Sequence, residues 1–206
     1  LQKTQLEKER LVKENVQSQL ESLRNQVNPH FFFNSLNTLA YLIPEDPAKA
    51  ENFVQKLSKA YRYILEIRDK QLVTLEEELV FLDSYTCLLQ ERFGENLLVK
   101  VDAPEEILPY KLVPLSLQML FENAIKHNVI STQSPLVIEV FVENTDRLVV
   151  KNNLQRKNQT MPSTKVGLEN ISRRYKLVSD HEVEVIMTQQ SFIVILPLIK
   201  VEPASV

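Results

Sequence analysis

The apolar residues of this chain change their spacing at Gly94, and this change constrains the fold more than any other feature. Before Gly94 they recur every three or four residues, as on the buried face of an α-helix. After it come β-branched or alternating runs of strand length, at 97–102, 136–143, 147–152, 181–187 and 191–198. Helical patterns over 113–128 and about 165–178 separate them. We therefore predict an α+β fold, with a helical unit over residues 1–93 and a mixed sheet covered by helices over 94–206.

The first helical pattern, over residues 1–27, contains neither Gly nor Pro. Its apolar positions follow spacings of four and three, as in the seam of a short coiled coil: Val12, Val16, Leu20, Leu23 and Val27. This favours pairing with a second copy of the chain, and the alternative is a single amphipathic helix packed on its own domain. The chain begins without Met inside this charged helical pattern, which suggests a fragment of a longer protein.

Three more helices are expected before Gly94. The pattern is helical from Phe31 to Leu42, and Pro44 and Pro47 should then break it. Another helix should begin after Asp46 and run to about Leu65. A third should begin at Thr74, where Thr74 and Glu77 fit a capping box, and end at Gly94. We expect a hinge at 92–96, between the helical unit and the sheet.

Composition excludes several classes of protein. The net charge of −3 argues against a nucleic-acid partner, because phosphate recognition requires a basic surface. No apolar run approaches the roughly 20 residues needed to cross a bilayer. Cys87 is the single cysteine and is expected to be a small buried residue in a reducing cytosol.

An unusual density of special residues surrounds His30, in the run QVNPHFFFNSLN at 26–37. His30 directly follows Pro29, a residue favoured in the first turn of a helix. Its unperturbed pKa of about 6.5 leaves a neutral nitrogen available near pH 7, so His30 is a candidate nucleophile or proton carrier. The three phenylalanines after it cannot all point the same way from a helix.

A second cluster lies in the helical pattern at 113–128, where Glu122, Asn123, Lys126 and His127 share one face. Carboxylate and carbonyl oxygens suit Mg²⁺, and a lysine beside them suits a phosphate. A solvated polar face is the alternative, although an asparagine is a poor choice for an exposed helix. The opposite face is apolar and carries Leu117, Leu120, Phe121 and Ala124.

A third element is the segment 166–170, which contains Gly167 and Leu168 and opens a helix after a long polar loop at 152–164. A glycine at a helix start lets backbone amides approach an anion such as phosphate. By itself this signal is weak, since a glycine there is also a common capping device. The chain has no P-loop motif, which excludes a P-loop nucleotidase.

Together these segments resemble a known family. NPHFFFNSLN resembles the phosphoacceptor motif of the LytS-type sensor histidine kinases. LFENAIKHN resembles the N-box of their GHKL ATP-binding domain, and KVGLENISRRY is similar to its glycine box. The resemblance implies a helical dimerisation and phosphoacceptor hairpin followed by a GHKL-type α/β sandwich, in the family's order over nearly the whole chain.

The resemblance also implies a reaction and its residues. His30 would be autophosphorylated from ATP, with Asn34 orienting the imidazole or merely bonding along the helix, and the phosphoryl group would pass to an aspartate of a response regulator. Asn123 would hold Mg²⁺, Glu122 would support it, and Lys126 would meet the phosphates. The remaining nucleotide contacts would come from His127, Asn152, Gly167 and Leu168. The protein would be a homodimer in the cytoplasm, anchored to a membrane only through a segment absent from this chain.

The chain departs from the family pattern at two places. The family's DxGxG element is replaced by Lys151-Asn152-Asn153-Leu154, so both of its glycines are missing. Met119 stands where hydrolytic GHKL proteins place a water-activating carboxylate, which predicts slow ATP hydrolysis. The alternative to an active kinase is a degenerate dimeric scaffold that binds a regulator without nucleotide. A third option, a GHKL ATPase of another kind, is disfavoured by Met119.

Overall fold

The computed structural model describes residues 29–155 and 166–200. The chain forms two compact units, Leu1–Val54 and Gln55–Val206. The domain boundary expected after residue 93 differs from this division and lies inside the second unit. The expected coiled coil at 1–27 and most of the polar loop at 152–164 fall outside the described residues.

Helices α2 (Pro29–Glu45) and α3 (Pro47–Glu66) confirm two of the predicted helices. Helix α2 starts at Pro29 and passes through Pro44, which was predicted to break it. It continues because the amide of Asp46 still donates to the carbonyl of Leu42, at 2.8 Å. The side chain of Asp46 then accepts from the amide of Lys49 at 3.0 Å, as expected for the residue that caps α3.

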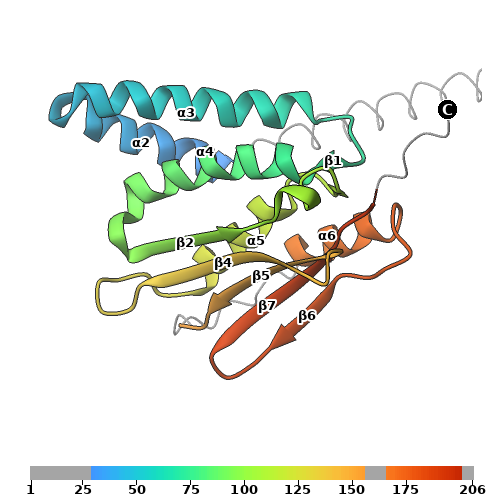
Figure 1. Cartoon of the computed structure of the whole chain (residues 1–206). Helices are drawn as coiled ribbons and strands as arrows, with labels where there is room; N and C mark the ends of the chain where they lie inside the picture. The colour runs from blue at the N-terminus through green and yellow to red at the C-terminus, as the bar shows by residue number, and fades with distance from the viewer. Residues whose placement is uncertain (1–28, 156–165, 201–206) are drawn as a thin grey trace, which may run out of the picture. The chain divides into compact units, whose positions relative to one another are not determined.

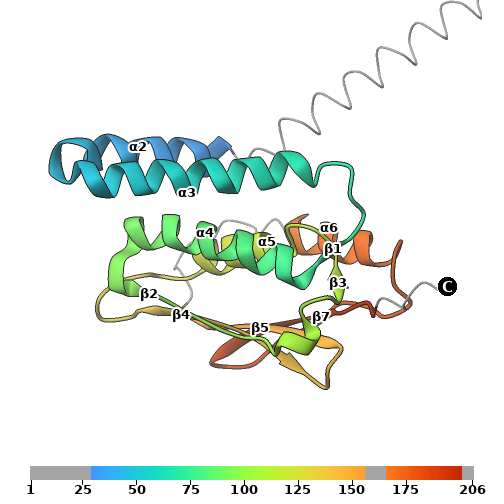
Figure 2. The same ribbon diagram turned by 45° about the horizontal axis from the view of Figure 1, so that its top comes forward.

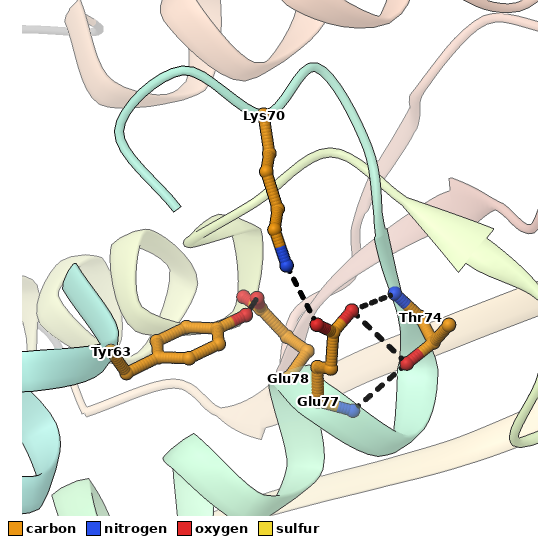
Figure 3. Close-up of polar contacts among 5 residues, drawn as sticks. All are labelled: Tyr63, Lys70, Thr74, Glu77 and Glu78. Carbon is orange, nitrogen blue, oxygen red and sulfur yellow. Dashed lines mark hydrogen bonds and ion pairs between the residues drawn. The ribbon is translucent and has the colours of Figure 1, made fainter. Parts of the chain in front are cut away.

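Helix α4 (Leu75–Phe93) begins with the predicted capping box. The Thr74 hydroxyl accepts from the Glu77 amide at 3.1 Å, and the Glu77 carboxylate accepts from the Thr74 amide at 2.8 Å (Figure 3). Gly94 ends the helix with a φ of 57°, a conformation that favours glycine. The segment expected to be a hinge contains a short 3₁₀ helix, Gly94–Asn96.

The second unit contains a mixed five-stranded sheet, which confirms the α+β class. Its strands in sheet order are β2 (Leu97–Asp102), β4 (Leu136–Glu143), β5 (Arg147–Asn153), β7 (Ser191–Pro197) and β6 (Glu184–Met187). Only the β2–β4 pair is parallel, and the other neighbours are antiparallel. Strand β6 forms one edge, and the side chains of Val185, Ile186 and Met187 on it are exposed.

Helices α4, α5 (Ser116–His127) and α6 (Val166–Tyr175) cover one face of this sheet (Figures 1 and 2). The alternating pattern of β4 places Leu136, Ile138 and Val140 in the core, each at most 1% exposed. The apolar face predicted for α5 is buried as well, through Leu117, Leu120, Phe121 and Ala124. This layer of helices positions the residues of the candidate site.

Four sequence-based expectations need correction. Helix α5 starts at Ser116 rather than 113, because Pro114 and a left-handed Leu115 (φ 62°) precede it. Strand β6 starts at Glu184, so His181 lies before the strand. Two short paired strands, β1 (Val73–Thr74) and β3 (Lys111–Leu112), were missed. Cys87 is free and half-buried rather than buried.

Tight turns connect β4 to β5 and β6 to β7. Asn144 and Thr145 between β4 and β5 both have positive φ, at 51° and 63°. Between β6 and β7 the Thr188 hydroxyl accepts from the Ser191 amide at 2.9 Å.

Within residues 29–155 and 166–200, no helix has the length and apolar character to cross a membrane.

Candidate functional site

His30 is the second residue of α2, in the first compact unit. Asn34 lies one turn later and is half-buried, and its backbone carbonyl accepts from the Thr38 hydroxyl at 3.0 Å. The three phenylalanines diverge as expected, since Phe31 is buried while Phe32 and Phe33 are 37% and 64% exposed. The rings of Phe32 and Phe33 meet edge to face, with centroids 6.1 Å apart.

Glu122 and Asn123 project from α5 in the second unit, and both are half-buried. The Glu122 carboxylate accepts from the amide of Gln118 at 2.8 Å and from the hydroxyl of Tyr85 at 3.5 Å. Burial and the nearby Glu122 charge raise the pKa of Tyr85 well above its ordinary value, so this hydroxyl stays a donor. The carboxylate next to Asn123 is therefore held from α4 and from its own helix. Lys126 is exposed and His127 half-buried on the same helix.

Asn123 and Gly167 lie next to each other although 44 positions (167 − 123) separate them in the sequence. A Cβ on Gly167 would lie 3.5 Å from both polar atoms of the Asn123 side chain. The missing side chain therefore leaves room directly beside the Asn123 amide. Leu168 follows Gly167 in the first turn of α6 and is half-buried. Helix packing thus joins two of the three segments singled out in the sequence.

Asn152 lies near the end of β5, paired with Ile138 on β4 and Phe192 on β7. It is 6% exposed, and its amide nitrogen donates to the carbonyl of Asn153 at 2.7 Å. Asn153 has a structural role, because its side chain accepts from the amide of Val137 at 2.9 Å and donates to the carbonyl of Pro135 at 3.1 Å. The segment that replaces DxGxG is therefore fixed to the sheet.

Comparison with known proteins gives the family. A histidine kinase family model matches residues 18–97. Sensor histidine kinase YpdA of Escherichia coli (strain K12) is 32% identical over 176 residues, 78% of this chain and 30% of that protein. Sensor protein LytS of Enterococcus faecalis (strain ATCC 700802 / V583) is 32% identical over 174 residues, 77% of this chain and 29% of that protein. The chain belongs to the LytS-type sensor histidine kinases. It spans about a third of the length of these relatives or less.

A solved structure is also similar to this sensor histidine kinase chain. It is the histidine kinase domain of the Erythrobacter litoralis EL346 blue-light activated histidine kinase, at 14% identity and a TM-score of 0.45. The match covers 90% of this chain and 92% of that one.

Two features of this histidine kinase chain were missed in the sequence. The first is Asn128, directly after α5, whose side chain donates to the carbonyl of Ala124 at 2.8 Å and accepts from the amide of Gln155 at 2.7 Å. The amide of Val129 also donates to the carbonyl of Gln155, at 2.7 Å. The end of α5 is thus tied to the chain that leaves β5. An asparagine just after a helix is a common terminating residue, which was the available signal.

The second missed residue is Glu78, the fully buried carboxylate of α4 (Figure 3). It stands three and four residues before the buried Phe81 and Leu82, on the core face of the helix. A glutamate on a core face needs partners, so this spacing was the signal that could have revealed it.

Proposed function

We propose that this chain is the core of an ATP-dependent protein-histidine kinase, which autophosphorylates on His30 and passes the phosphoryl group to an aspartate of a response regulator. The observation that carries the proposal is the contact between Asn123 and the space left by Gly167. It joins the N-box to the glycine box, while His30 stands in the first turn of a separate helix. The family of the chain supports the same reaction.

In the proposed reaction a ring nitrogen of His30 attacks the γ-phosphorus of ATP with its lone pair. The bond from that phosphorus to the bridging oxygen breaks, and its electrons leave with ADP. The protein mainly positions the reactants and neutralises charge in such a step. Lys126 would neutralise phosphate charge, and Asn34, one turn after His30, would orient the imidazole.

The donor set fits nucleotide-bound Mg²⁺. Magnesium in phosphoryl-transfer sites is held by one or two protein oxygens together with phosphates, rather than by a cage of carboxylates. The Asn123 amide oxygen supplies such an oxygen beside the position of Gly167. Glu122, the preceding residue of α5, would support it with a carboxylate that Gln118 and Tyr85 hold. Magnesium would neutralise the charge of the phosphates. Among residues 29–155 and 166–200 there is no group of three or more His, Cys, Asp and Glu that could hold a metal ion.

The remaining nucleotide contacts in this proposal come from three places. The Asn152 side chain would meet the adenine, and His127 would line the adenine pocket. The backbone of Gly167 and Leu168 would meet the phosphates at the start of α6, where amides and the helix dipole favour an anion.

The proposed partners follow from the reaction. A response regulator would accept the phosphoryl group, and a second copy of the chain would complete a dimer. We also propose that the chain is the cytoplasmic portion of a membrane-anchored protein, as its resemblance to the LytS-type sensor kinases implies.

The test is incubation with γ-labelled ATP and Mg²⁺. We expect a protein-bound label that is lost in acid, is stable in base and is absent from His30→Gln. An Asn34→Asp variant is a less drastic change in the same helix and should retain part of the label. Release of phosphate should be slow, since Met119 cannot activate water. Vigorous ATP hydrolysis that persists in His30→Gln would overturn the proposal.

One observation favours a second candidate, a scaffold that binds a regulator without nucleotide. Asn152 and Asn153 replace the DxGxG element, and both side chains make hydrogen bonds within the protein. Nucleotide titration with and without Mg²⁺ separates the candidates. The kinase predicts Mg²⁺-dependent binding that weakens in Asn123→Ala, whereas the scaffold predicts no binding by either protein.

A further inference from the structure

Glu78 is fully buried, and the proposed reaction does not use it. Its carboxylate accepts three hydrogen bonds. They come from the hydroxyl of Tyr63 at 2.8 Å, the amide of Leu115 at 3.2 Å and the amide of Leu117 at 3.4 Å. Figure 3 shows the Tyr63 ring directed at this carboxylate. The donors belong to α3, to the residue before α5 and to the first turn of α5, all in the second compact unit.

The start of α5 depends on this carboxylate. A helix begins with amides that have no partner within the helix, and a side chain at the N-cap commonly satisfies them. Leu115 occupies the N-cap of α5, and its own apolar side chain makes no capping hydrogen bond. Leu115 also has a φ of 62°, a left-handed conformation that is unfavourable for a leucine. Glu78 therefore supplies from α4 the acceptor that α5 lacks.

A positive charge supports the same junction. The guanidinium of Arg174 on α6 donates to the carbonyl of Pro114 at 2.9 Å, and its charge acts on Glu78. Pro114 directly precedes Leu115, so α6 holds the chain that leads into α5. Four helices thus meet at one buried carboxylate, and α5 is the one among them that carries Glu122, Asn123 and Lys126.

We propose that Glu78 is a positioning residue of the nucleotide site, which fixes the start of α5 and, through the Tyr63 hydroxyl, makes the placement of α5 depend on α3. The effect of Glu78 on nucleotide binding rests on the proposed function, whereas its effect on the placement of α5 does not. Capping interactions and hydrogen bonds to a charged group are large enough to shift such a helix start.

The first test uses protein without nucleotide. At about pH 8, where the Glu78 carboxylate is ionised, Glu78→Gln keeps the shape of the side chain and removes its charge. Glu76→Gln is the matched control, since Glu76 is exposed in the same turn of α4. Amide hydrogen exchange over 115–127 should speed up roughly tenfold in Glu78→Gln, as expected for loss of hydrogen bonds to a charged group. It should not change in Glu76→Gln. Equal exchange in all three proteins would overturn the inference.

Tyr63→Phe is the gentler variant, since it removes a single hydroxyl and keeps the ring. In the parent protein, a non-hydrolysable ATP analogue with Mg²⁺ should slow exchange over 115–127 and also over 55–66 of α3. In Tyr63→Phe the slowing over 115–127 should persist, and the slowing over 55–66 should disappear. If Glu78→Gln fails to fold, the comparison of Tyr63→Phe with the parent protein tests the inference by itself. If the nucleotide analogue slows exchange over 55–66 equally in Tyr63→Phe and in the parent protein, the dependence of α5 on α3 is refuted.

The proposed kinase activity and the role of Glu78 in holding α5 can be refuted separately. A parent protein that binds no nucleotide refutes the proposed kinase, and exchange in the ligand-free proteins still decides whether Glu78 holds α5. If the parent protein binds nucleotide, Glu78→Gln should raise the dissociation constant roughly tenfold. Binding that is unchanged in Glu78→Gln would refute the positioning role while leaving the kinase intact.

Discussion

Glu78 holds its proton more tightly than an ordinary glutamate. Burial raises its pKa from 4.5 to about 7, although the hydrogen bonds from Tyr63, Leu115 and Leu117 and the charge of Arg174 act in the opposite direction. Tyr63 and Tyr175 also interact with it, and burial raises the pKa of both hydroxyls above the ordinary value, so both stay neutral. Glu78 is thus the group of this junction that titrates near neutral pH.

The free energy of unfolding should therefore depend on pH through Glu78. The folded chain keeps a proton that the unfolded chain releases above about 4.5, so this contribution is fully present below pH 4.5 and is lost as pH rises through about 7. Urea unfolding of the parent protein and Glu78→Gln across pH 4.5–8 tests this. The difference in stability, parent minus variant, should fall over that range. A constant difference would mean that Glu78 has an ordinary pKa.

Replacing Gly167 with alanine should stabilise the fold and weaken the binding of Mg²⁺-nucleotide. The position has no positive φ and lies in the first turn of α6, so Gly167→Ala should stabilise the fold by about 0.5–1 kcal/mol in urea unfolding. The added methyl group would occupy the space 3.5 Å from the Asn123 amide, and Mg²⁺-nucleotide affinity should fall in a titration. Ser172→Ala, later in α6, is the control for helix propensity alone. Unchanged affinity of Gly167→Ala for Mg²⁺-nucleotide would show that Gly167 is not part of the nucleotide site.

At the level of elements, the turn between β4 and β5 contains a strained residue. Asn144 and Thr145 both have positive φ, which asparagine tolerates and a β-branched threonine does not. Thr145→Gly should raise the free energy of unfolding by about 1 kcal/mol, because glycine adopts this conformation without strain. Asn144→Gly should have a smaller effect, which makes it the control. A lower free energy of unfolding for Thr145→Gly than for the parent protein would show that Thr145 is not strained.

The sequence predicted elements where a periodic pattern was long enough. The apolar face of α5 and the alternation of β4 correctly indicated their buried sides, and the Thr74–Glu77 capping box located the start of α4. Strands β1 and β3 have two residues each, which is too short for a period. The start of α5 was misplaced because it follows the left-handed backbone of Leu115. The contacts of Glu78 with the Leu115 amide and of Arg174 with the Pro114 carbonyl hold this segment, and they leave no local pattern.

The sequence indicated candidate site residues but not the contacts that hold them. Spacing within one helix grouped Glu122 and Asn123, the glycine box indicated Gly167, and their roles in the site stay predictions. The contact between Asn123 and Gly167 follows from the packing of α5 on α6, which the sequence alone does not specify. Tyr85 and Gln118, which hold Glu122, were not singled out because an aromatic residue and a glutamine on a helix are ordinary.

At the level of the whole molecule, the division into units predicts which fragments fold. Helix α4 contributes Phe81, Leu82, Tyr85 and Leu88 to the core, each at most 3% exposed, and contacts both α5 and β2. A fragment of residues 55–206 keeps these side chains and Glu78, so it should unfold cooperatively in urea and bind Mg²⁺-nucleotide. It should carry no label from ATP, because it lacks His30.

A fragment of residues 94–206, which follows the boundary expected from the sequence, should lose the cooperative transition. Its sheet and α5 would expose the apolar surface that α4 covers. Near-ultraviolet circular dichroism and urea titration of both fragments provide the comparison. Similar cooperative transitions in the two fragments would show that α4 is dispensable to the second unit.

The position of β6 at the edge of the sheet has a practical consequence for anyone who concentrates this protein. In the part of the chain that the structure describes, β6 pairs with β7 alone, and three of its apolar side chains are exposed. Edge strands of this kind can act as templates to which another extended polypeptide adds by backbone pairing. Self-association through this strand would then grow with concentration, and it would be suppressed by a lysine at the strand's centre rather than by added salt.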